Sequence, residues 1–118
     1  MSTTPLQWSV FSVDLDPSVG SEQAGRRPVL IVSRESANAV LPVISAIPLT
    51  TRKPQRRIYP NEALIPKGHA GQKRDSIAMA HQLRTLSKTR LGRHIGHLDD
   101  LGIRDEVRSA MRTQLDLD

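Results

Sequence analysis

The fold of this chain is decided by residues 13–33, whose sequence is VDLDPSVGSEQAGRRPVLIVS. The rough alternation of apolar and polar side chains leading into this stretch predicts a strand over residues 8–15. Asp16-Pro17 ends that strand, because proline has no amide donor. After a polar loop, Pro28 opens a second strand, over residues 29–33, which is apolar on both faces and therefore typical of a buried central strand. Two such strands can hold a Glu and an Arg of the intervening loop close together.

The remainder of the chain predicts further short strands and a single convincing helix. Apolar runs bounded by proline, glycine and polar residues indicate strands over residues 40–49, 58–65, 76–80 and 81–86, the last two being either separate or one long bent strand. Ser87 can cap one helical turn over residues 87–91. The apolar residues of the predicted helix follow one another at spacings of three and four, with Asp99 or Asp100 as its cap: Ile103, Val107, Ala110, Met111 and Leu115. This order predicts a mainly β (α+β) fold, a small, strongly bent sheet or barrel with a C-terminal helix packed on it.

Length and composition limit the classes of protein to which the chain can belong. Its 118 residues fit one domain, over residues 1–118, with a modest core. It has no cysteine, which excludes disulfides and thiolate metal sites, and its four histidines form no set with metal-ligand spacing. We therefore expect no metal and no cofactor. The N-terminus lacks the features of a secretory signal and no apolar run is long enough to span a membrane, so the expected location is cytoplasmic.

Charge is distributed unevenly along the sequence. The formal net charge is +5, from 17 Lys and Arg against 12 Asp and Glu. Residues 1–98 hold 14 basic and 6 acidic side chains, whereas residues 99–118 hold 3 and 6. A basic body with an acidic last segment indicates a polyanion-binding surface, although a merely arginine-rich protein would have the same total. With only three aromatic residues, the chain is not expected to hold a nucleic acid by stacking successive bases, and guanidiniums and backbone groups would have to hold it.

Arg27 is the strongest candidate for a functional side chain. It immediately precedes Pro28, which biases the residue before it toward an extended backbone. An arginine presented from a rigid strand start can make a two-pronged contact with a phosphate, which a lysine cannot copy. Because the high pKa of a guanidinium makes it a poor proton donor, the role we assign to Arg27 is stabilisation of transition-state charge. The alternative is a surface arginine at the end of a loop.

Residues 14–28 carry the motif D-x-D-P-x-x-G-S-E-Q-x-G-x-R-P. In this motif the chain resembles the MazF/PemK toxins, the metal-independent endoribonucleases (mRNA interferases) of type II toxin–antitoxin pairs, and the likeness spans about residues 8–115. The resemblance implies an SH3-like barrel and a homodimer that cuts single-stranded RNA at a short sequence. It also implies attack by the 2′-hydroxyl, which leaves a 2′,3′-cyclic phosphate and a 5′-hydroxyl. The implied regulator is a cognate, MazE-like antitoxin whose acidic, disordered tail covers the RNA groove.

The resemblance also implies roles for individual residues. It makes Arg27 catalytic and Glu22, within the GSEQ motif, a candidate general base. It makes Thr50 the residue that contacts the scissile phosphate, with Thr51 as the alternative register. Glu22 could instead pair with a neighbouring arginine and only order the loop. The residues expected to bind RNA are Gln23, Arg26, Thr51, Arg52, Gln82 and Arg84.

Residues 81–85, HQLRT, resemble the late Q-x-R-[ST] strand of the family with one departure. The family usually places an acidic residue before the glutamine, and some members are thought to use that carboxylate as their base. This chain has His81 there. Histidine ordinarily has a pKa of about 6.5 and could act as an acid or a base near neutral pH, or it could be a core side chain bonded to a backbone carbonyl. The general base is therefore either Glu22 or His81.

Two other functions are compatible with the sequence. One is a non-catalytic toxin of the same fold that acts by protein binding, as the CcdB-like gyrase poisons do. The loop with Glu22 and Arg27 argues against it, because those poisons act through a C-terminal helix and need no such loop. The other is a cleavage-dead RNA-binding module, an alternative that follows from His81 standing where the family usually has an acidic residue. The motif of residues 14–28 favours the nuclease.

Overall fold

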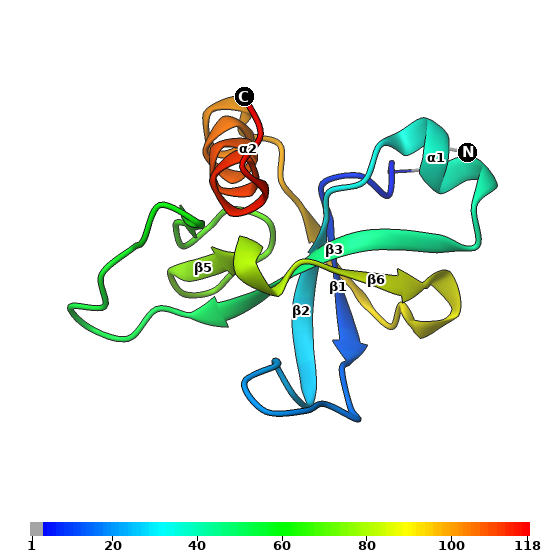
Figure 1. Cartoon of the computed structure of the whole chain (residues 1–118), viewed down its shortest axis with the longest axis horizontal. Coiled ribbons are helices and arrows are strands. Elements are labelled where there is room, and N and C mark those ends of the chain that lie inside the picture. The colour runs from blue at the N-terminus through cyan, green and yellow to red at the C-terminus, as the bar shows by residue number, and fades with distance from the viewer. Residues whose placement is uncertain (1–3) are drawn as a thin grey trace.

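The structure is a computed structural model that describes residues 4–118. Over these residues, seven antiparallel strands form one strongly curled sheet, a half-barrel, and a C-terminal helix packs at one end of it (Figure 1). The strands run in the order β4-β5-β3-β2-β1-β7, and β6 pairs with β3 off this path. Their bounds are β1 (Ser9–Asp14), β2 (Arg26–Ile31), β3 (Val43–Thr51), β4 (Glu62–Ile65), β5 (Ser76–Met79), β6 (Arg84–Ser87) and β7 (His94–His97). The predicted mainly β fold with a packed terminal helix is confirmed.

The two strands predicted from residues 8–33 are present and pair with each other. β1 and β2 are antiparallel, with Val10 opposite Leu30 and Asp14 opposite Arg26. β2 begins at Arg26, before Pro28, because the two arginines continue the ladder with β1. It lies between β1 and β3, and three of its six residues, Val29, Leu30 and Ile31, are fully buried. The prediction of a buried central strand is confirmed.

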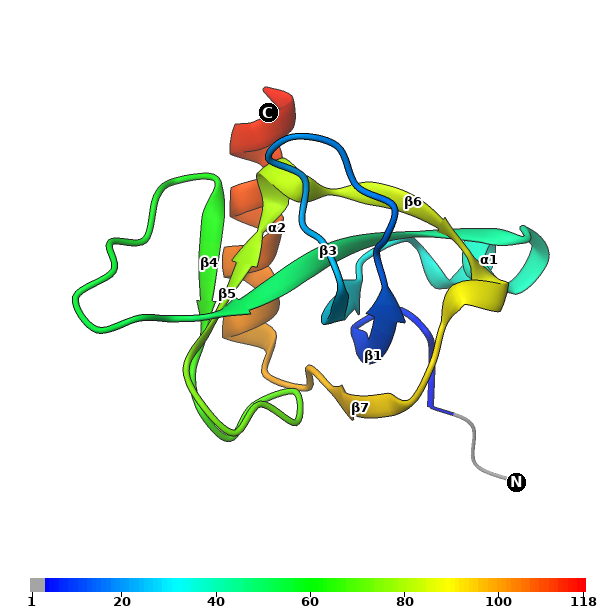
Figure 2. The same cartoon turned by 90° about the horizontal axis from the view of Figure 1, so that it is seen from below.

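β3 is the longest strand and organises the sheet around it. Its nine residues pair with β2 through residues 46–48, with β6 through residues 43–46 and with β5 through residues 49–51. Figures 1 and 2 show β3 crossing the molecule, with β6 along one part of it and β5 along the other. The β1–β2 loop described below joins two paired strands of which β2 also pairs with β3, and the turn between β5 and β6 joins two strands that both pair with β3.

The prediction of strand for residues 80–82 is wrong, because they form a 3-10 turn, η1 (Ala80–Gln82), between β5 and β6. The reason lies in the register on β3. The chain takes six residues to pass from Ala78 to Arg84, whereas β3 takes three between their partners, Leu49 and Ala46. The turn takes up the excess. His81 therefore stands on a turn and not in a strand, and its side chain is exposed.

Three further elements differ from the sequence-based expectation. β4 begins only at Glu62, so residues 58–61 form a turn and not the start of a strand. A short helix, α1 (Glu35–Val40), and strand β7 were not predicted. The helical turn predicted over residues 87–91 is present as η2 (Lys88–Arg90), with the hydroxyl of Ser87 accepting from the amide of Thr89 at 3.3 Å.

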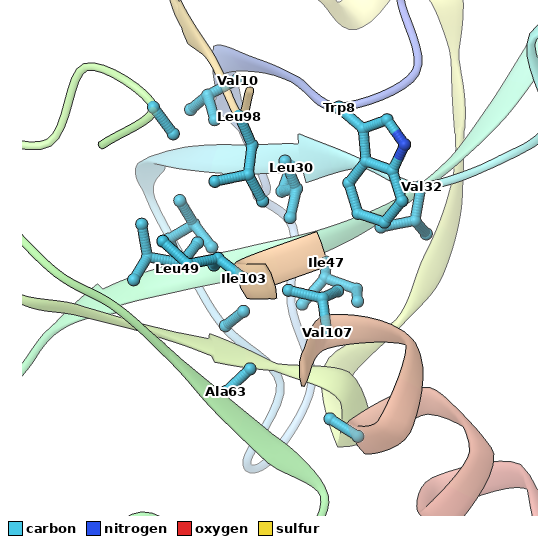
Figure 3. Packing of buried hydrophobic residues seen from close by; sticks show 14 of the residues in the cluster. Trp8, Val10, Leu30, Val32, Ile47, Leu49, Ala63, Leu98, Ile103 and Val107 are labelled. Carbon is cyan, nitrogen blue, oxygen red and sulfur yellow. The ribbon is translucent and has the colours of Figure 1, made fainter. Parts of the chain in front are cut away.

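The terminal helix α2 (Leu101–Leu115) closes one end of the half-barrel. Asp100 caps it by accepting a hydrogen bond from the amide of Ile103 at 2.9 Å. Figure 3 shows Ile103 and Val107 pointing toward Leu49 and Ile47 of the sheet. The helix residues Ile103, Val107 and Ala110 are buried, whereas Leu115 is half-exposed, so its predicted place in the apolar face is wrong. No helix among the described residues is long and apolar enough to cross a membrane.

Trp8 belongs to the same core. Its ring is 4% exposed and lies beside Val32 in Figure 3. The guanidiniums of Arg104 and Arg108 lie 5.4 and 5.0 Å from the ring centroid. These contacts tie the start of the chain to helix α2 through a cation–π interaction.

Candidate active site

Hydrogen bonds of backbone groups and carboxylates hold the two ends of the β1–β2 loop together. The carboxylate of Asp16 accepts a hydrogen bond from the amide of Gly25 at 3.0 Å, and the carbonyl of Gly25 accepts one from the amide of Leu15 at 2.9 Å. Gly25 has φ +74°, a conformation that glycine adopts without strain. Asp14 adds a bond to the amide of Asp16 at 3.0 Å. The DxDP residues and the glycine of the motif therefore set the direction in which the loop leaves the sheet.

The body of the loop is tied to the turn η1 by Gln82. Its amide nitrogen donates to the carbonyl of Ser21 at 3.1 Å, and its amide oxygen accepts from the backbone of Gln23 at 3.4 Å. Figure 2 shows the loop arching over to this turn from the end of β1. Two segments about sixty residues apart in the sequence are thereby held side by side.

A cleft of about 380 Å³ lies where the loop meets the turn. It is lined by Glu22 and Gln23 from the loop, by Pro48 from β3, and by residues 81–85, which are His81, Gln82, Leu83, Arg84 and Thr85. Five of the residues selected from the sequence therefore share one cleft: Glu22, Gln23, His81, Gln82 and Arg84. Among residues 4–118, the side-chain oxygen of Gln23 is buried without a hydrogen-bond partner. An acceptor buried without a partner is costly, and it can be satisfied by a bound water, an ion or a ligand.

Arg27 and Thr50 lie at the same level of the sheet, next to this cleft, although neither lines it. The β2–β3 ladder ends at the pair Val29–Pro48, and Arg27 and Thr50 each lie two residues beyond this pair on the two neighbouring strands. Alternation along β3 puts Thr50 on the same face as Pro48, which lines the cleft, and puts Thr51 on the other face. Thr50 is half-buried and Thr51 is exposed. Thr50, and not Thr51, therefore shares the face of β3 that borders the cleft.

The side chain of Arg27 is held by the loop that precedes it. Its Nε donates to the carbonyl of Ala24 at 3.1 Å. Glu22 makes no ion pair with a basic side chain among the described residues; its carboxylate accepts from the amide of Val19 at 2.6 Å. The alternative in which Glu22 orders the loop by pairing with Arg26 or Arg27 has no support from these contacts.

The other residues predicted to bind RNA lie outside the cleft. Arg26 points to the opposite face of β2 from Arg27 and approaches the hydroxyl of Ser12 at 3.4 Å. Arg52 follows β3 and donates from Nε to the carbonyl of Arg56 at 2.9 Å. It belongs to the basic connection between β3 and β4, which extends away from the sheet in Figures 1 and 2.

His81 borders the cleft on one side and a second cavity on the other. This second cavity, of about 630 Å³, is lined by Arg56, Tyr59, Pro60, Asn61, Glu62, His81 and Thr113. The alternative of a buried core histidine is wrong, because His81 is exposed on its turn. Its imidazole is placed where it can reach solvent and a bound substrate.

The second cavity contains an ion pair that sequence reasoning missed. The side chain of Glu62 is 1% exposed and receives two hydrogen bonds from Arg56, at 3.0 and 2.7 Å. It also accepts from the amide of Tyr59 at 3.0 Å. Burial opposes ionisation, but these hydrogen bonds outweigh it, with the charge of Arg56 and the influence of His81, and lower the pKa of Glu62 below its ordinary value. The one signal in the sequence was a carboxylate inside the apolar run 58–65.

Among residues 4–118, no three His, Cys, Asp or Glu side chains are grouped so that they could hold a metal ion. The polar groups that the cleft offers are a carboxylate, an imidazole, two amides, a hydroxyl and a guanidinium, with a second guanidinium and a second hydroxyl beside it at Arg27 and Thr50. These groups can take up a proton, donate one and neutralise negative charge. Groups of these kinds are the ones that acid–base chemistry on a phosphate ester uses.

The half-barrel with this cleft is the architecture of a class of small bacterial toxins, and the comparisons are specific. The family model described as PemK-like, MazF-like toxin of type II toxin-antitoxin system matches residues 6–115. The chain is 38% identical over 110 residues to Endoribonuclease EndoA of Bacillus subtilis, which covers 92% of this chain and 91% of that protein. It is 34% identical over 108 residues to Endoribonuclease MazF of Staphylococcus saprophyticus, and the match covers 92% of this chain and 88% of that protein. The chain belongs to the PemK-like, MazF-like toxin family.

Solved structures agree with this assignment. An endoribonuclease in complex with its cognate antitoxin from a mycobacterial species has a TM-score of 0.79 and 26% identity, covering 98% of both chains. MazF from Deinococcus radiodurans has a TM-score of 0.78 and 25% identity, covering 98% of this chain and all of that one. The family resemblance stated from residues 14–28 is confirmed.

Gln82 offers a test of how the loop is held. Gln82→Ala removes both contacts to the loop, so Glu22 and Gln23 lose their fixed position over the cleft. We expect faster amide hydrogen exchange over residues 18–25 and, in a cleavage assay, a roughly tenfold lower kcat, since a slightly misplaced group is costly. Thr85→Ala, which changes the same cleft without touching the loop, serves as the comparison. Unchanged exchange in Gln82→Ala would contradict the tether.

Proposed function

We propose that this chain is a metal-independent, sequence-specific endoribonuclease toxin that cuts single-stranded RNA. The observation that carries the proposal is the cleft in which Glu22 of the β1–β2 loop meets His81 and Arg84, beside Arg27 and Thr50. Relatives with the printed name endoribonuclease, at 34–38% identity, support it. A ribose 2′-oxygen attacks the adjacent phosphorus, and the bond from phosphorus to the 5′-oxygen breaks. The products are a 2′,3′-cyclic phosphate and a 5′-hydroxyl.

The roles of the residues follow from their chemistry. Glu22 or His81 takes the proton of the 2′-hydroxyl, and the imidazole of His81 can return a proton to the departing 5′-oxygen. Arg27 neutralises the charge that develops on the phosphorane, with Thr50 donating to a phosphate oxygen. Gln23, Gln82 and Arg84 hold the RNA in the cleft. RNA in a duplex is excluded, because its geometry does not bring the 2′-hydroxyl in line with the leaving group.

The partners proposed for the chain are a second copy and an antitoxin. Solved relatives are described as complexes of an endoribonuclease with its cognate antitoxin and of MazE with MazF. By analogy, this chain forms a homodimer, and a MazE-like antitoxin with an acidic, disordered tail covers the cleft and blocks RNA. Such a toxin would act in the cytoplasm, where its messenger RNA substrates are.

The proposal is tested by incubating the purified protein with a long unstructured RNA in EDTA. We expect cuts at a short recurring sequence and 5′-hydroxyl ends, which resist ligation until they are phosphorylated. Cleavage that needs added divalent metal would contradict the mechanism. No cleavage under any condition would favour the protein-binding toxin or the RNA-binding module.

The part played by His81 can be separated from that of Glu22 by the pH dependence of cleavage. If His81 exchanges the proton, His81→Gln lowers kcat by about 10²-fold and removes one limb of the pH–rate profile. Glu22→Gln then lowers the rate while leaving that limb in place. A profile that keeps its shape in His81→Gln would assign the proton transfer to Glu22.

A further inference from the structure

The cavity beside the cleft, defined above by Arg56, Tyr59, Pro60, Asn61, Glu62, His81 and Thr113, is not used by the mechanism. Its volume of about 630 Å³ lies within the range usual for small-ligand sites, about 300–1,000 Å³. It is formed by the turn before β4, by η1 and by the end of α2, three segments that lie together in Figure 2. His81 lines both this cavity and the cleft, so the two spaces are neighbours.

We propose that this cavity binds one unpaired nucleobase of the RNA, next to the bond that is cut, and that Asn61 reads its polar edge. The inference rests on the proposed function and deepens it, because it names a site that contributes to the choice of cleavage sequence. A base adjacent to a phosphate in the cleft needs only to pass His81 to enter the cavity.

The walls of the cavity suit the two apolar faces of a base. The ring of Tyr59 is 48% exposed, and the guanidiniums of Arg56 and Arg57 lie 5.4 and 5.0 Å from its centroid. Aromatic rings and guanidinium planes are the surfaces on which splayed RNA bases stack. Pro60 and Thr113 add further apolar contact.

The polar groups of the cavity suit the edge of a base. Asn61 donates from its amide nitrogen to the side chain of Gln114 at 3.1 Å, which fixes the orientation of the amide and leaves its oxygen free to accept. The carboxylate of Glu62 is already occupied by Arg56 and by the amide of Tyr59. That buried pair holds the floor of the cavity in shape before any ligand arrives, and preorganisation favours binding.

Charge directs a polyanion to the same place. The connection between β3 and β4 carries Arg52, Lys53, Arg56 and Arg57, with no acidic residue between Thr51 and Asn61. This basic segment borders the cavity through Arg56 and attracts the backbone of the chain whose base enters it. An acidic peptide would be attracted too, but it has no flat apolar group to fill the space beside Tyr59.

Occupancy of the cavity by RNA is tested directly with Arg27→Ala protein, which we expect to leave the RNA uncut. An unstructured RNA containing all four bases is bound and cross-linked with short-wavelength ultraviolet light, and mass spectrometry locates the linked residue. We expect a cross-link on Tyr59 that disappears when unlabelled competitor RNA is added. Cross-links confined to other segments, or none at all, would overturn the proposal whether or not the native protein cuts RNA.

Specificity is tested by mapping the 5′ ends of products from a mixed RNA pool. Asn61→Ala should reduce the base preference at a single position of the cleavage motif by about tenfold, the loss expected when one base contact is removed. Gln114→Ala removes the bond that orients the Asn61 amide but leaves that amide in the cavity, so we expect a smaller loss at the same position of the motif. An unchanged motif in Asn61→Ala, or the same change in Gln114→Ala, contradicts readout by Asn61. Intact RNA specificity with weakened antitoxin binding would assign the cavity to the antitoxin.

Discussion

Arg27→Ala is expected to abolish RNA cleavage while leaving the fold intact. A guanidinium that neutralises developing charge in a phosphate reaction contributes strongly to the transition state, and its loss should lower kcat by about 10³-fold. The side chain is half-buried, and its one hydrogen bond within the described residues, to Ala24, lies at the surface. The circular dichroism spectrum and the unfolding midpoint should therefore change little.

Two further arginine variants make this result specific. Arg27→Lys should recover only a small part of the activity, because an ammonium cannot make the two-pronged contact. Arg34→Ala removes the exposed arginine that precedes α1, beyond the end of β2 opposite the β1–β2 loop, and should leave cleavage unchanged. Full activity in Arg27→Ala would remove this residue from the mechanism and, with it, the argument from the register of β2 and β3.

The parts of the fold that sequence predicted are those whose signal is local. β1 and β2 were predicted because Asp16-Pro17 and Pro28 punctuate an apolar pattern, and α2 because its apolar spacing is long and regular. β7 was missed, since His94–His97 has no alternation and is a strand only through its pairing with β1. α1 has six residues and no side-chain cap, so neither the length of a periodic pattern nor a capping residue predicted a helix there.

The candidate site was predictable only through the motif and its family. Nothing local indicates that Gln82 bonds Ser21 and Gln23, because that contact depends on the position of η1 over β3. Likewise, a strand was predicted where His81 stands on a turn, since the three-residue excess against β3 is visible only once the strands are paired. The sequence alone therefore could not predict the second cavity, nor that His81 lies between it and the cleft.

Glu62→Ala is expected to be the most destabilising of the substitutions considered. Glu62 is a carboxylate that is 1% exposed, with three hydrogen bonds, and its loss leaves the amide of Tyr59 without an acceptor and the partly shielded Arg56 with the carbonyl of Arg57 alone. We expect the free energy of unfolding to fall by about 3 kcal/mol, at the low end for a broken buried pair because Arg56 can turn to water. Urea unfolding measures this as a lower midpoint with an unchanged m-value.

The matched comparison is an ion pair of the same type at the surface. Arg108 and Asp105 are 3.2 Å apart, with side chains 43% and 76% exposed. Asp105→Ala should change the free energy of unfolding by no more than about 0.5 kcal/mol, since exposed pairs of this kind contribute little. Equal effects of the two substitutions would mean that the burial of Glu62 has no energetic consequence.

The same carboxylate makes stability depend on pH in a predictable direction. The pKa of Glu62 in the folded protein lies below its ordinary value of 4.5, because the hydrogen bonds and charge of Arg56 outweigh the cost of burial. A group with a lowered folded pKa stabilises the fold fully above 4.5, and that contribution is lost as the pH falls through the folded pKa. The unfolding free energy of the native protein should therefore drop below pH 4.5 more steeply than that of Glu62→Gln. The pKa of Glu35 is also lowered, because hydrogen bonds from Gln7, Asn38 and Leu6 outweigh the effect of its burial. Glu35 is present in both proteins and therefore contributes the same loss of unfolding free energy in acid to each. Parallel curves for the two proteins in acid would show that Glu62 is not the carboxylate on which the loop before β4 depends.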